Sequence, residues 1–272
     1  MNKFLALTAT IILGSTLLFS GCGSSTTSSN NTGKTTITIG ASPVPHAEIL
    51  NEAKAELEKE GIELKIVEFT DYVKPNLALN DKEIDANFFQ HQPYLDKFNA
   101  DRGLELISAG TVHIEPMAIY SHSLKDIAAI QDGAKVAIPN DPTNGGRALL
   151  LLAKAGLIEL NDNNNIHATV TDVKSNPHHL QIIELEAPQL PRSLDDVAIA
   201  VINTNYALEA NLNPLKDALL TESKDSPYAN IIAIRKDEEN RPEIKKLMKA
   251  LQSAEMKKFI EDKYKGSILP AF

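Results

Sequence analysis

Two rhythms of apolar and polar residues alternate along the chain. Residues 36–42, TITIGAS, have the character of a buried strand, whereas residues 46–61 place apolar side chains three and four positions apart, as an amphipathic helix does. Residues 62–69, IELKIVEF, return to the two-residue period of a strand, and a helix is expected after Pro75. This order of strand and helix predicts an α/β fold with a doubly wound sheet.

The same alternation continues to the end of the chain. After a strand-rich passage, the second half holds a further series of expected elements: strands at 134–139 and 229–235, short elements at 168–173, 180–187 and 197–205, a helix beginning near Gly145, and one final helix over 241–264. Two separate series of strands and helices, in a chain of this length, predict two α/β lobes with a cleft between them.

The first residues have the layout of a secretory signal. Lys3 precedes the apolar run FLALTATIILGSTLLF, and small residues precede Cys22. The segment FSGC resembles the lipobox of bacterial lipoproteins, in which the cysteine is acylated and becomes the mature N-terminus. We expect a signal peptide over residues 1–21 and a lipidated, flexible tether over residues 22–35, which are almost free of apolar side chains. An ordinary cleaved signal is the alternative.

Composition narrows the range of partners and chemistry. The chain carries 27 basic and 36 acidic residues, a formal net charge of −9, and the acidic groups are dispersed among lysines. Phosphate binding needs a basic surface, so nucleic acid is not expected as a partner. Because Cys22 is the only cysteine, an intrachain disulfide and a zinc–thiolate cluster are excluded.

One stretch, DANFFQHQPYLDKF at residues 85–98, holds four of the 14 aromatic residues. We expect a strand that ends at Phe89 and a helix that begins at Pro93, so that the connecting QHQ lies at the carboxyl edge of a sheet, where open α/β folds bind ligands. The residues are expected to serve two purposes: Phe88, Leu95 and Phe98 the core of the lobe, and Phe89, His91 and Tyr94 the cleft.

A second stretch, PNDPTNGGRALLLL at residues 139–152, joins a strand to a helix through a turn rich in Asn, Asp, Pro and Gly. Free backbone N–H groups and the positive end of a helix dipole predict an anion site there. Arg147 could clamp a carboxylate with two hydrogen bonds, or it could simply face solvent. The stretch lacks the GxxxxGK[ST] pattern of a phosphate-binding loop, so a carboxylate fits better than a nucleotide.

No enzyme signature stands out in the rest of the chain. The seven histidines are scattered without an HExxH pair, and His178 and His179 are expected in a surface loop rather than at a metal. A GxSxG nucleophile elbow is absent. We therefore expect neither catalysis nor a metal or cofactor.

Four long segments together resemble the methionine-binding lipoproteins, the substrate-binding components of bacterial methionine ABC importers. In chain order they are DYVKPNLALNDKEIDANFFQHQPYL, VAIPNDPTNGGRALLLL, IIELEAPQLPRSLDD and AVINTNYA. The similarity extends over essentially the whole chain, the signal included.

The resemblance implies a type II periplasmic-binding-protein fold, in which two α/β lobes joined by two crossovers enclose a ligand. Lobe 1 would comprise residues 36–117 and 228–272, and lobe 2 residues 118–227. The protein would be anchored by lipid on the outer side of the cytoplasmic membrane, at the cell surface or in the periplasm. There it would capture methionine, with L-methionine as the leading candidate, and deliver it to an ABC permease with separate ATPase subunits.

The family's binding residues can be carried over position by position. The aromatic pocket for the thioether tail falls on Tyr72, Phe89, His91 and Tyr94, with His113 beside it. The carboxylate would be held by Asn144 and Arg147, and the head group would be bound by Asn203 and Asn230. Family members vary at the positions of His113 and Glu115, where some carry aromatic residues.

Several alternatives stay open from the sequence. The ligand could be D-methionine, a methionine-containing dipeptide or another apolar amino acid, because one extra group in a pocket changes affinity by only a few kcal/mol. A surface lipoprotein of this kind could also act as an adhesin. A hydrolase has the least support, because no nucleophile with a base is recognisable.

Overall fold

The computed structural model describes residues 34–223 and 226–272. The expected signal peptide, Cys22 and nearly all of the expected tether lie outside the described residues. The helices are α1 (Glu48–Lys59), α2 (Lys74–Asn80), α3 (Gln92–Arg102), α4 (Pro142–Lys154), α5 (Leu190–Ser193), α6 (Thr204–Glu209), α7 (Pro242–Leu251) and α8 (Ala254–Tyr264). The strands are β1 (Thr35–Ala41), β2 (Ile62–Glu68), β3 (Ala86–His91), β4 (Leu106–Ile114), β5 (Ala118–Tyr120), β6 (Lys135–Pro139), β7 (Glu159–Leu160), β8 (Val173–Ser175), β9 (Gln181–Leu185), β10 (Ile199–Ile202), β11 (Ala218–Thr221), β12 (Ala229–Arg235) and β13 (Leu269–Pro270).

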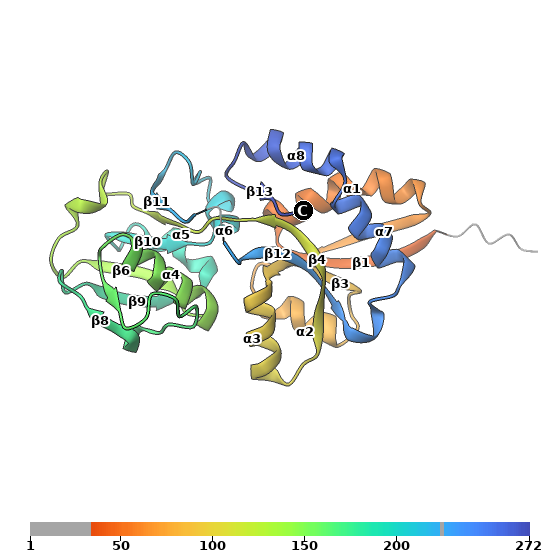
Figure 1. Cartoon of the computed structure of the whole chain (residues 1–272). Helices are drawn as coiled ribbons and strands as arrows, with labels where there is room; N and C mark the ends of the chain where they lie inside the picture. Colours follow the sequence, from red (N-terminus) through yellow and green to blue (C-terminus); the bar gives the residue numbers. More distant parts are fainter. Residues whose placement is uncertain (1–33, 224–225) are drawn as a thin grey trace, which may run out of the picture. The chain divides into compact units, whose positions relative to one another are not determined.

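Residues 34–223 and 226–272 fold around two mixed β-sheets, which Figure 1 shows side by side. The first has the strand order β13-β4-β12-β3-β1-β2, and the second has the order β11-β5-β10-β6-β9. Each contains parallel strands next to antiparallel ones: β1 pairs in parallel with β2 and β3, and β6 with β9 and β10. The α/β fold and its two lobes are thus confirmed.

The chain passes between the two sheets twice. It leaves the first sheet after β4 and enters the second at β5, and it returns after β11 to β12. β4 and β12 are hydrogen-bonded neighbours, so both crossovers lie together (Figure 1). Glu115, which directly follows β4, and Asn230, near the start of β12, are therefore placed between the lobes.

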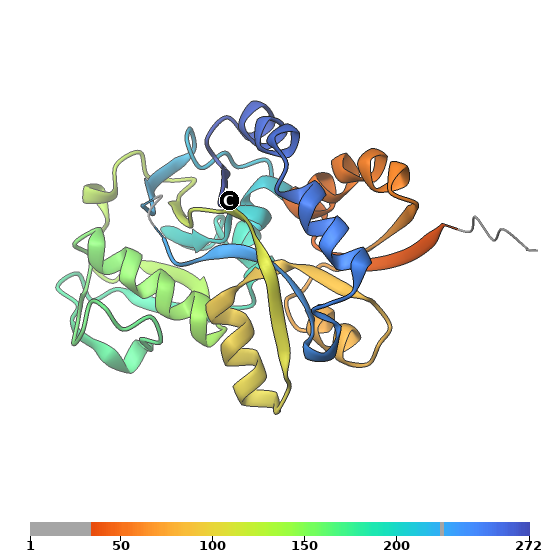
Figure 2. The same cartoon turned by 45° about the vertical axis from the view of Figure 1, so that its right-hand side comes forward.

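Each lobe has its own apolar core, because one face of each helix is buried against its sheet. In lobe 1, α1, α7 and α8 cover the sheet, with Ile49, Leu247 and Ile260 fully or almost fully buried. Figure 2 shows α7 and α8 in blue alongside α1 in orange. In lobe 2, α4 buries Leu149 and Leu152 against the second sheet.

Three expected boundaries differ from the observed ones. β3 continues past Phe89 to His91, because its last residues pair with β12. α4 begins at Pro142 rather than near Gly145, because Asp141 caps it. The single helix expected over 241–264 is two helices, since the Ser253 hydroxyl accepts the Met256 N–H at 3.1 Å and starts α8 anew.

Among the described residues, no helix combines the length and apolar character needed to cross a membrane.

Candidate functional site

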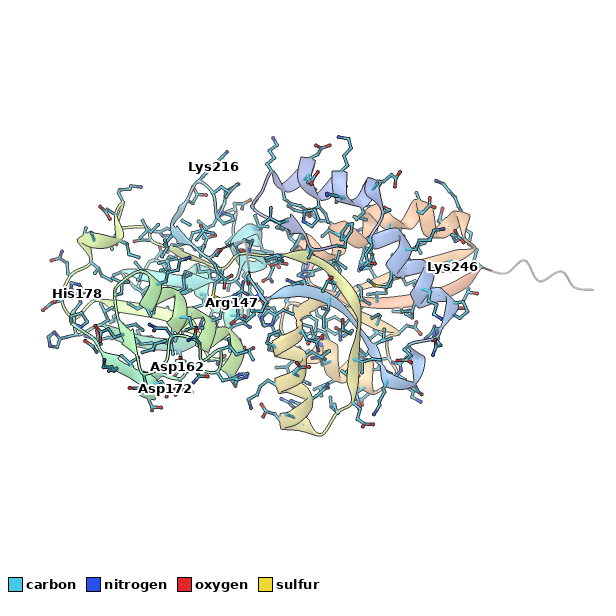
Figure 3. All side chains as sticks on the ribbon, in the orientation of Figure 1. Arg147, Asp162, Asp172, His178, Lys216 and Lys246 are labelled. Carbon is cyan, nitrogen blue, oxygen red and sulfur yellow. The ribbon has the colours of Figure 1, made fainter. Side chains whose placement is uncertain are left out.

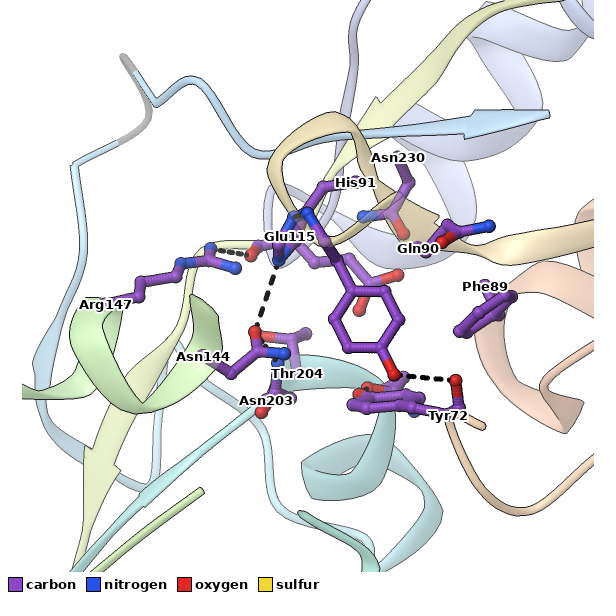
Figure 4. Close-up of a pocket in the computed structure, with 12 residues that line it drawn as sticks. Tyr72, Phe89, Gln90, His91, Glu115, Asn144, Arg147, Asn203, Thr204 and Asn230 are labelled. Atoms are coloured by element: carbon purple, nitrogen blue, oxygen red, sulfur yellow. Dashed lines mark hydrogen bonds between the residues drawn. The ribbon is translucent and has the colours of Figure 1, made fainter. Parts of the chain in front are cut away.

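A small pocket lies where β3, β6 and β10 reach their carboxyl ends. About 340 Å³ of space lies between its lining atoms, a volume that includes open solvent. Both lobes contribute to the lining, which consists of Tyr72, Phe89, Gln90, His91, Tyr94, Glu115, Asn144, Arg147, Asn203, Thr204, Asn205 and Asn230. Figure 4 shows Arg147 at one end and Phe89 with Tyr72 at the other.

The pocket brings together eight of the nine residues proposed from the sequence: Tyr72, Phe89, His91, Tyr94, Asn144, Arg147, Asn203 and Asn230. The ninth, His113, is fully buried and reaches the pocket only through its hydrogen bond to Glu115. The sequence reasoning missed Gln90, Thr204 and Asn205 and noted Glu115 only as a variable position. Gln90 and Thr204 adjoin predicted residues in the chain and Asn205 directly follows Thr204, and this proximity is the signal that could have found them.

The apolar end is a cluster of aromatic rings. The ring centroids of Tyr72, Phe89 and Tyr94 lie 5.8 to 6.0 Å apart. The Tyr94 hydroxyl donates to the backbone oxygen of Tyr72 at 2.8 Å, and the Tyr72 hydroxyl donates to Asn205 Oδ1 at 2.6 Å. Phe98 stacks on Tyr94 at 5.9 Å, so it supports this cluster instead of joining Phe88 in the main core of the lobe.

His91 is fixed at both ring nitrogens. Its Nδ1 accepts the Tyr94 backbone N–H at 3.2 Å, which caps α3. Its Nε2 therefore carries the proton and donates to Asn144 Oδ1 in lobe 2 at 3.2 Å. Burial, together with the nearby charge of Arg147, lowers the pKa of His91 to about 3. The imidazole is thus a neutral side chain that connects the two lobes.

The start of α4 is not the free anion site that the sequence suggested. The carboxylate of Asp141 already accepts the Asn144 backbone N–H at 2.9 Å and the Asn144 side-chain amide at 3.0 Å. This carboxylate occupies the place that a ligand anion would take at the helix end. Burial raises the pKa of Asp141, while these hydrogen bonds favour its charged form.

Arg147 lies inside the molecule, only 3% exposed, so the solvent-facing alternative is wrong (Figure 3). Its guanidinium is already paired with Glu222, through Nε to Oε1 at 3.0 Å and Nη2 to Oε2 at 2.5 Å. Nη2 also donates to the backbone oxygen of Glu115 at 2.8 Å, and the guanidinium lies 4.2 Å from the ring centroid of Tyr228. These contacts leave the Nη1 edge for a ligand.

Amide side chains form the polar wall. Asn144 Oδ1 accepts from His91 and also from Asn203 Nδ2 at 2.9 Å, so the Asn144 amide is engaged on both sides. Two buried atoms in this wall, Asn203 Oδ1 and Asn205 Nδ2, have no hydrogen-bond partner among residues 34–223 and 226–272. Buried polar atoms are seldom left unpaired, so they mark where a polar ligand group fits.

A cluster of titratable side chains backs the pocket. Glu115 Oε1 accepts from His113 Nε2 at 2.7 Å and from His46 Nε2 at 3.2 Å. His46 Nε2 also contacts Asn230 Oδ1 at 3.0 Å, and its Nδ1 contacts the Ser42 hydroxyl at 2.9 Å. No sequence pattern predicted this cluster, since its two histidines are far apart in the chain.

Burial decides the charge of these two histidines. It lowers the pKa of His46 to about 4, with the charge of Glu115 acting in the opposite direction, and lowers that of His113 to about 3. Both imidazoles are therefore neutral donors at neutral pH. Burial also raises the pKa of Glu115, against the opposing influence of His46 and Arg147.

Comparison with known proteins agrees with this architecture. The family model of the NlpA lipoproteins matches residues 37–272. The chain belongs to the NlpA lipoprotein family.

Relatives within and around this family have informative names. A Vibrio cholerae protein named "probable D-methionine-binding lipoprotein MetQ" is 45% identical over 253 residues, which cover 93% of this chain and 92% of the relative. The structure of a nutrient-binding protein from Burkholderia cenocepacia bound to methionine is similar with a TM-score of 0.84 and 49% identity, over 87% of this chain and 100% of that one.

An ABC-transporter periplasmic substrate-binding protein from Coxiella burnetii is similar with a TM-score of 0.83 and 44% identity, over 86% of this chain and 100% of that one. At this level of identity and coverage the fold is shared. This NlpA-family chain therefore has the type II periplasmic-binding-protein fold expected from the sequence.

Proposed function

We propose that this protein is the substrate-binding lipoprotein of an ABC importer and that it captures free methionine. One observation carries the proposal: a buried pocket between two lobes has a wall of aromatic rings at one end and a guanidinium with unpaired amide atoms at the other. An amino acid with a long apolar side chain has the same two ends. The names of the similar proteins support methionine among such amino acids.

The thioether tail would lie among Tyr72, Phe89 and Tyr94, with His91 at the border of the polar wall. A sulfur atom beside an aromatic ring contributes about 0.3–1.5 kcal/mol per contact. The rings also remove the methylene groups from water, at about 0.8 kcal/mol for each. His113 stands behind the pocket as a support for Glu115.

The carboxylate would be held by the Nη1 edge of Arg147, and Asn203 and Asn230 would bind the head group. Asn144 takes part by holding His91 and Asn203 in place, because both sides of its amide are engaged. Glu222 neutralises Arg147 from the side away from the pocket. A charged carboxylate needs such a partner, since burial without one is strongly unfavourable.

Transport would depend on closure of the two lobes around the ligand. We propose lobe boundaries of 36–117 with 228–272 and of 118–227, so that the crossovers act as hinges. Hydrogen bonds that join the lobes around the pocket include those from Tyr72 to Asn205 at 2.6 Å, from His91 to Asn144 at 3.2 Å, and from Arg147 Nη2 to the Glu115 backbone oxygen at 2.8 Å. The closed form would be the one that docks on a permease with its ATPase subunits.

Attachment to the membrane would use lipid on Cys22, on the outer side of the cytoplasmic membrane, and the protein itself would perform no catalysis. Both expectations follow from the resemblance to the methionine-binding lipoproteins. Labelling with a radioactive fatty acid, lost in a Cys22→Ala variant, would test the anchor.

The central experiment is to identify the ligand that the purified protein carries. Mass spectrometry after denaturation should detect methionine, and calorimetry on ligand-stripped protein should detect its rebinding. The name of the Vibrio cholerae relative makes D-methionine the second candidate, so both enantiomers belong in the titration. Recovery of a different compound, with no heat from either enantiomer, would exclude methionine as the ligand.

A further inference from the structure

Arg147 and Glu115 are the basic and the acidic residue of the pocket lining, and they differ in their partners. Arg147 is already paired through three hydrogen bonds with Glu222, which is not part of the lining. In the described part of the chain, the carboxyl group of Glu115 forms ion-pair contacts with His46 and His113 and with no lysine or arginine. Burial raises the pKa of Glu115, and a cation placed beside it would favour its charged form.

Glu115 is held firmly in a place where water is scarce. The residue is only 6% exposed, and its Oε1 receives N–H groups from His113 and His46. The backbone N–H of Asn205 also donates to its carboxylate. A carboxylate has about four acceptor positions on two oxygens, so capacity toward the pocket remains.

The two histidines supply hydrogen bonds without supplying charge. His46 Nε2 faces two acceptor oxygens, Glu115 Oε1 and Asn230 Oδ1, so it carries the proton, and Nδ1 accepts from the Ser42 hydroxyl. His113 Nδ1 has no partner in the described part of the chain and is buried, so this ring also carries its proton on Nε2 toward Glu115. The cluster orients the carboxyl group, and neither neutral imidazole supplies a cation to it.

We propose that Glu115 is the subsite for the positively charged α-amino group of the ligand, and that His46 and His113 are positioning residues for it. The inference rests on the proposed function and deepens it, because it makes a free ammonium group a condition for binding. Figure 4 shows Glu115 between Arg147 and the rings of Tyr72 and Phe89, where the α-carbon of an amino acid would lie. Asn230, which contacts His46, adjoins the same place.

The subsite separates classes of ligand. A free amino acid brings an ammonium group to Glu115 and a carboxylate to Arg147. An N-acylated amino acid, a 2-hydroxy acid or a plain carboxylic acid brings no cation and leaves a buried carboxylate unpaired, which is costly. The pocket therefore selects zwitterions on charge as well as on shape.

The test compares L-methionine with 4-(methylthio)butanoate, which keeps the thioether and carboxylate but has hydrogen in place of the α-amino group. Stripped wild-type protein should bind methionine roughly 30-fold or more tightly, the range expected for a buried charge pair that loses one member. Equal binding of the two compounds would overturn the inference while leaving the proposed function intact. Binding of neither would refute the proposed function instead.

Variants of Glu115 test whether this residue causes the difference in affinity between methionine and the analogue. Glu115→Gln keeps the shape and should lower methionine affinity by about the same factor, with little change for the analogue, so that the affinity ratio approaches one. Equal weakening of both compounds would assign Glu115 a structural role only. Glu58→Gln, at an exposed glutamate, is the matched control and should keep the wild-type ratio. If Glu115→Gln does not fold, the test rests on the ratio of the two affinities in the wild-type protein and on the two His113 variants.

The positioning role has its own pair of variants. His113→Leu removes the N–H donor and should reduce the ratio, whereas His113→Gln offers an amide N–H at similar reach and should restore much of it. Identical ratios in both would overturn the positioning role. Dialysis against EDTA should leave methionine affinity unchanged; a loss reversed by zinc would mean that His46, His113 and Glu115 hold a metal rather than the ligand's ammonium group.

Discussion

Two strand-to-helix junctions contribute to the pocket, and they differ in the group that caps the helix. At the β3–α3 junction the cap is the neutral imidazole of His91, and at the β6–α4 junction it is the carboxylate of Asp141. The first presents rings to the pocket, whereas the second turns its own anion onto the helix end. A helix N-terminus is available to a ligand anion only if no side chain of the protein has already taken it.

The junctions also depend on each other. Asn144, in the first turn of α4, accepts from His91 and donates to Asp141, so a single amide connects the two caps across the lobes. We infer that this link fixes the position of the aromatic end of the pocket relative to the polar end. Substitutions at His91, Arg147, Phe89 and Asp141 would separate the contributions of the two junctions.

The pH dependence of the free energy of unfolding should report the protonation of His91, the cap of α3. Because the folded-state pKa of His91 is about 3 and its ordinary value is 6.5, the unfolded chain takes up a proton first as the pH falls. Stability should therefore fall from pH 6.5 toward 3, by up to about 1.4 kcal/mol per pH unit for this group.

Denaturant unfolding of wild type and His91→Gln across this range would measure the difference. The variant should have the shallower slope, and other buried histidines contribute equally to both proteins. Parallel curves would mean that His91 is not a buried neutral cap. Asp141, whose pKa is raised, acts in the opposite direction and is common to both proteins.

Arg147→Ala tests the polar junction. We expect methionine affinity to fall by about 2–5 kcal/mol, because a buried carboxylate would lose its partner. Calorimetry would measure the change, with Lys154→Ala, an exposed basic residue at the end of the same helix, as control. Unchanged affinity would remove Arg147 from the carboxylate site. Since Glu222 also loses its partner, the melting temperature should be measured in parallel.

Phe89→Ala tests the aromatic junction. Loss of a ring that covers the side chain of the ligand should cost about 1.5–3 kcal/mol of affinity. Phe259→Ala, which removes a ring that contacts Tyr264 on α8, is a suitable control outside the pocket lining. Retained affinity would move the thioether away from Phe89.

Asp141→Ala should affect the fold more than the ligand. Loss of the cap should lower the free energy of unfolding by about 0.5–2 kcal/mol, and Asp141→Ser, which retains a capping oxygen, should lower it less. Methionine affinity should change little. A large gain in affinity for Asp141→Ala would mean that the exposed helix end prefers to bind the ligand carboxylate itself.

Periodicity and turn residues were enough to predict most elements of this fold. The strand at 229–235 was predicted with its observed bounds, and Gly61 and Gly103, both with positive φ, follow the ends of α1 and α3. The errors occurred where a side chain or a neighbouring strand sets the boundary. α4 begins earlier than expected because Asp141 caps it, and the last helix is divided because Ser253 caps α8. β3 is longer than expected because its last residues pair with β12.

The binding residues were predictable to the extent that they stand in recognisable segments. Phe89, His91 and Tyr94 share one stretch, and Arg147 follows a clear strand-to-helix turn. Glu115 had no such context, because its neighbours His46 and His113 come from distant parts of the chain. Likewise, the sequence could not tell that Glu222 pairs with Arg147.

The sequence by itself determined the α/β order, the aromatic stretch and the family, because periodicity, residue type and motif are local properties of a chain. Only the tertiary structure decided which polar and charged groups meet: Asp141 with the start of α4, Glu222 with Arg147, and the two neutral histidines with Glu115. Electrostatic interactions depend on distance and burial, and both are fixed only when the two lobes and their crossovers have folded.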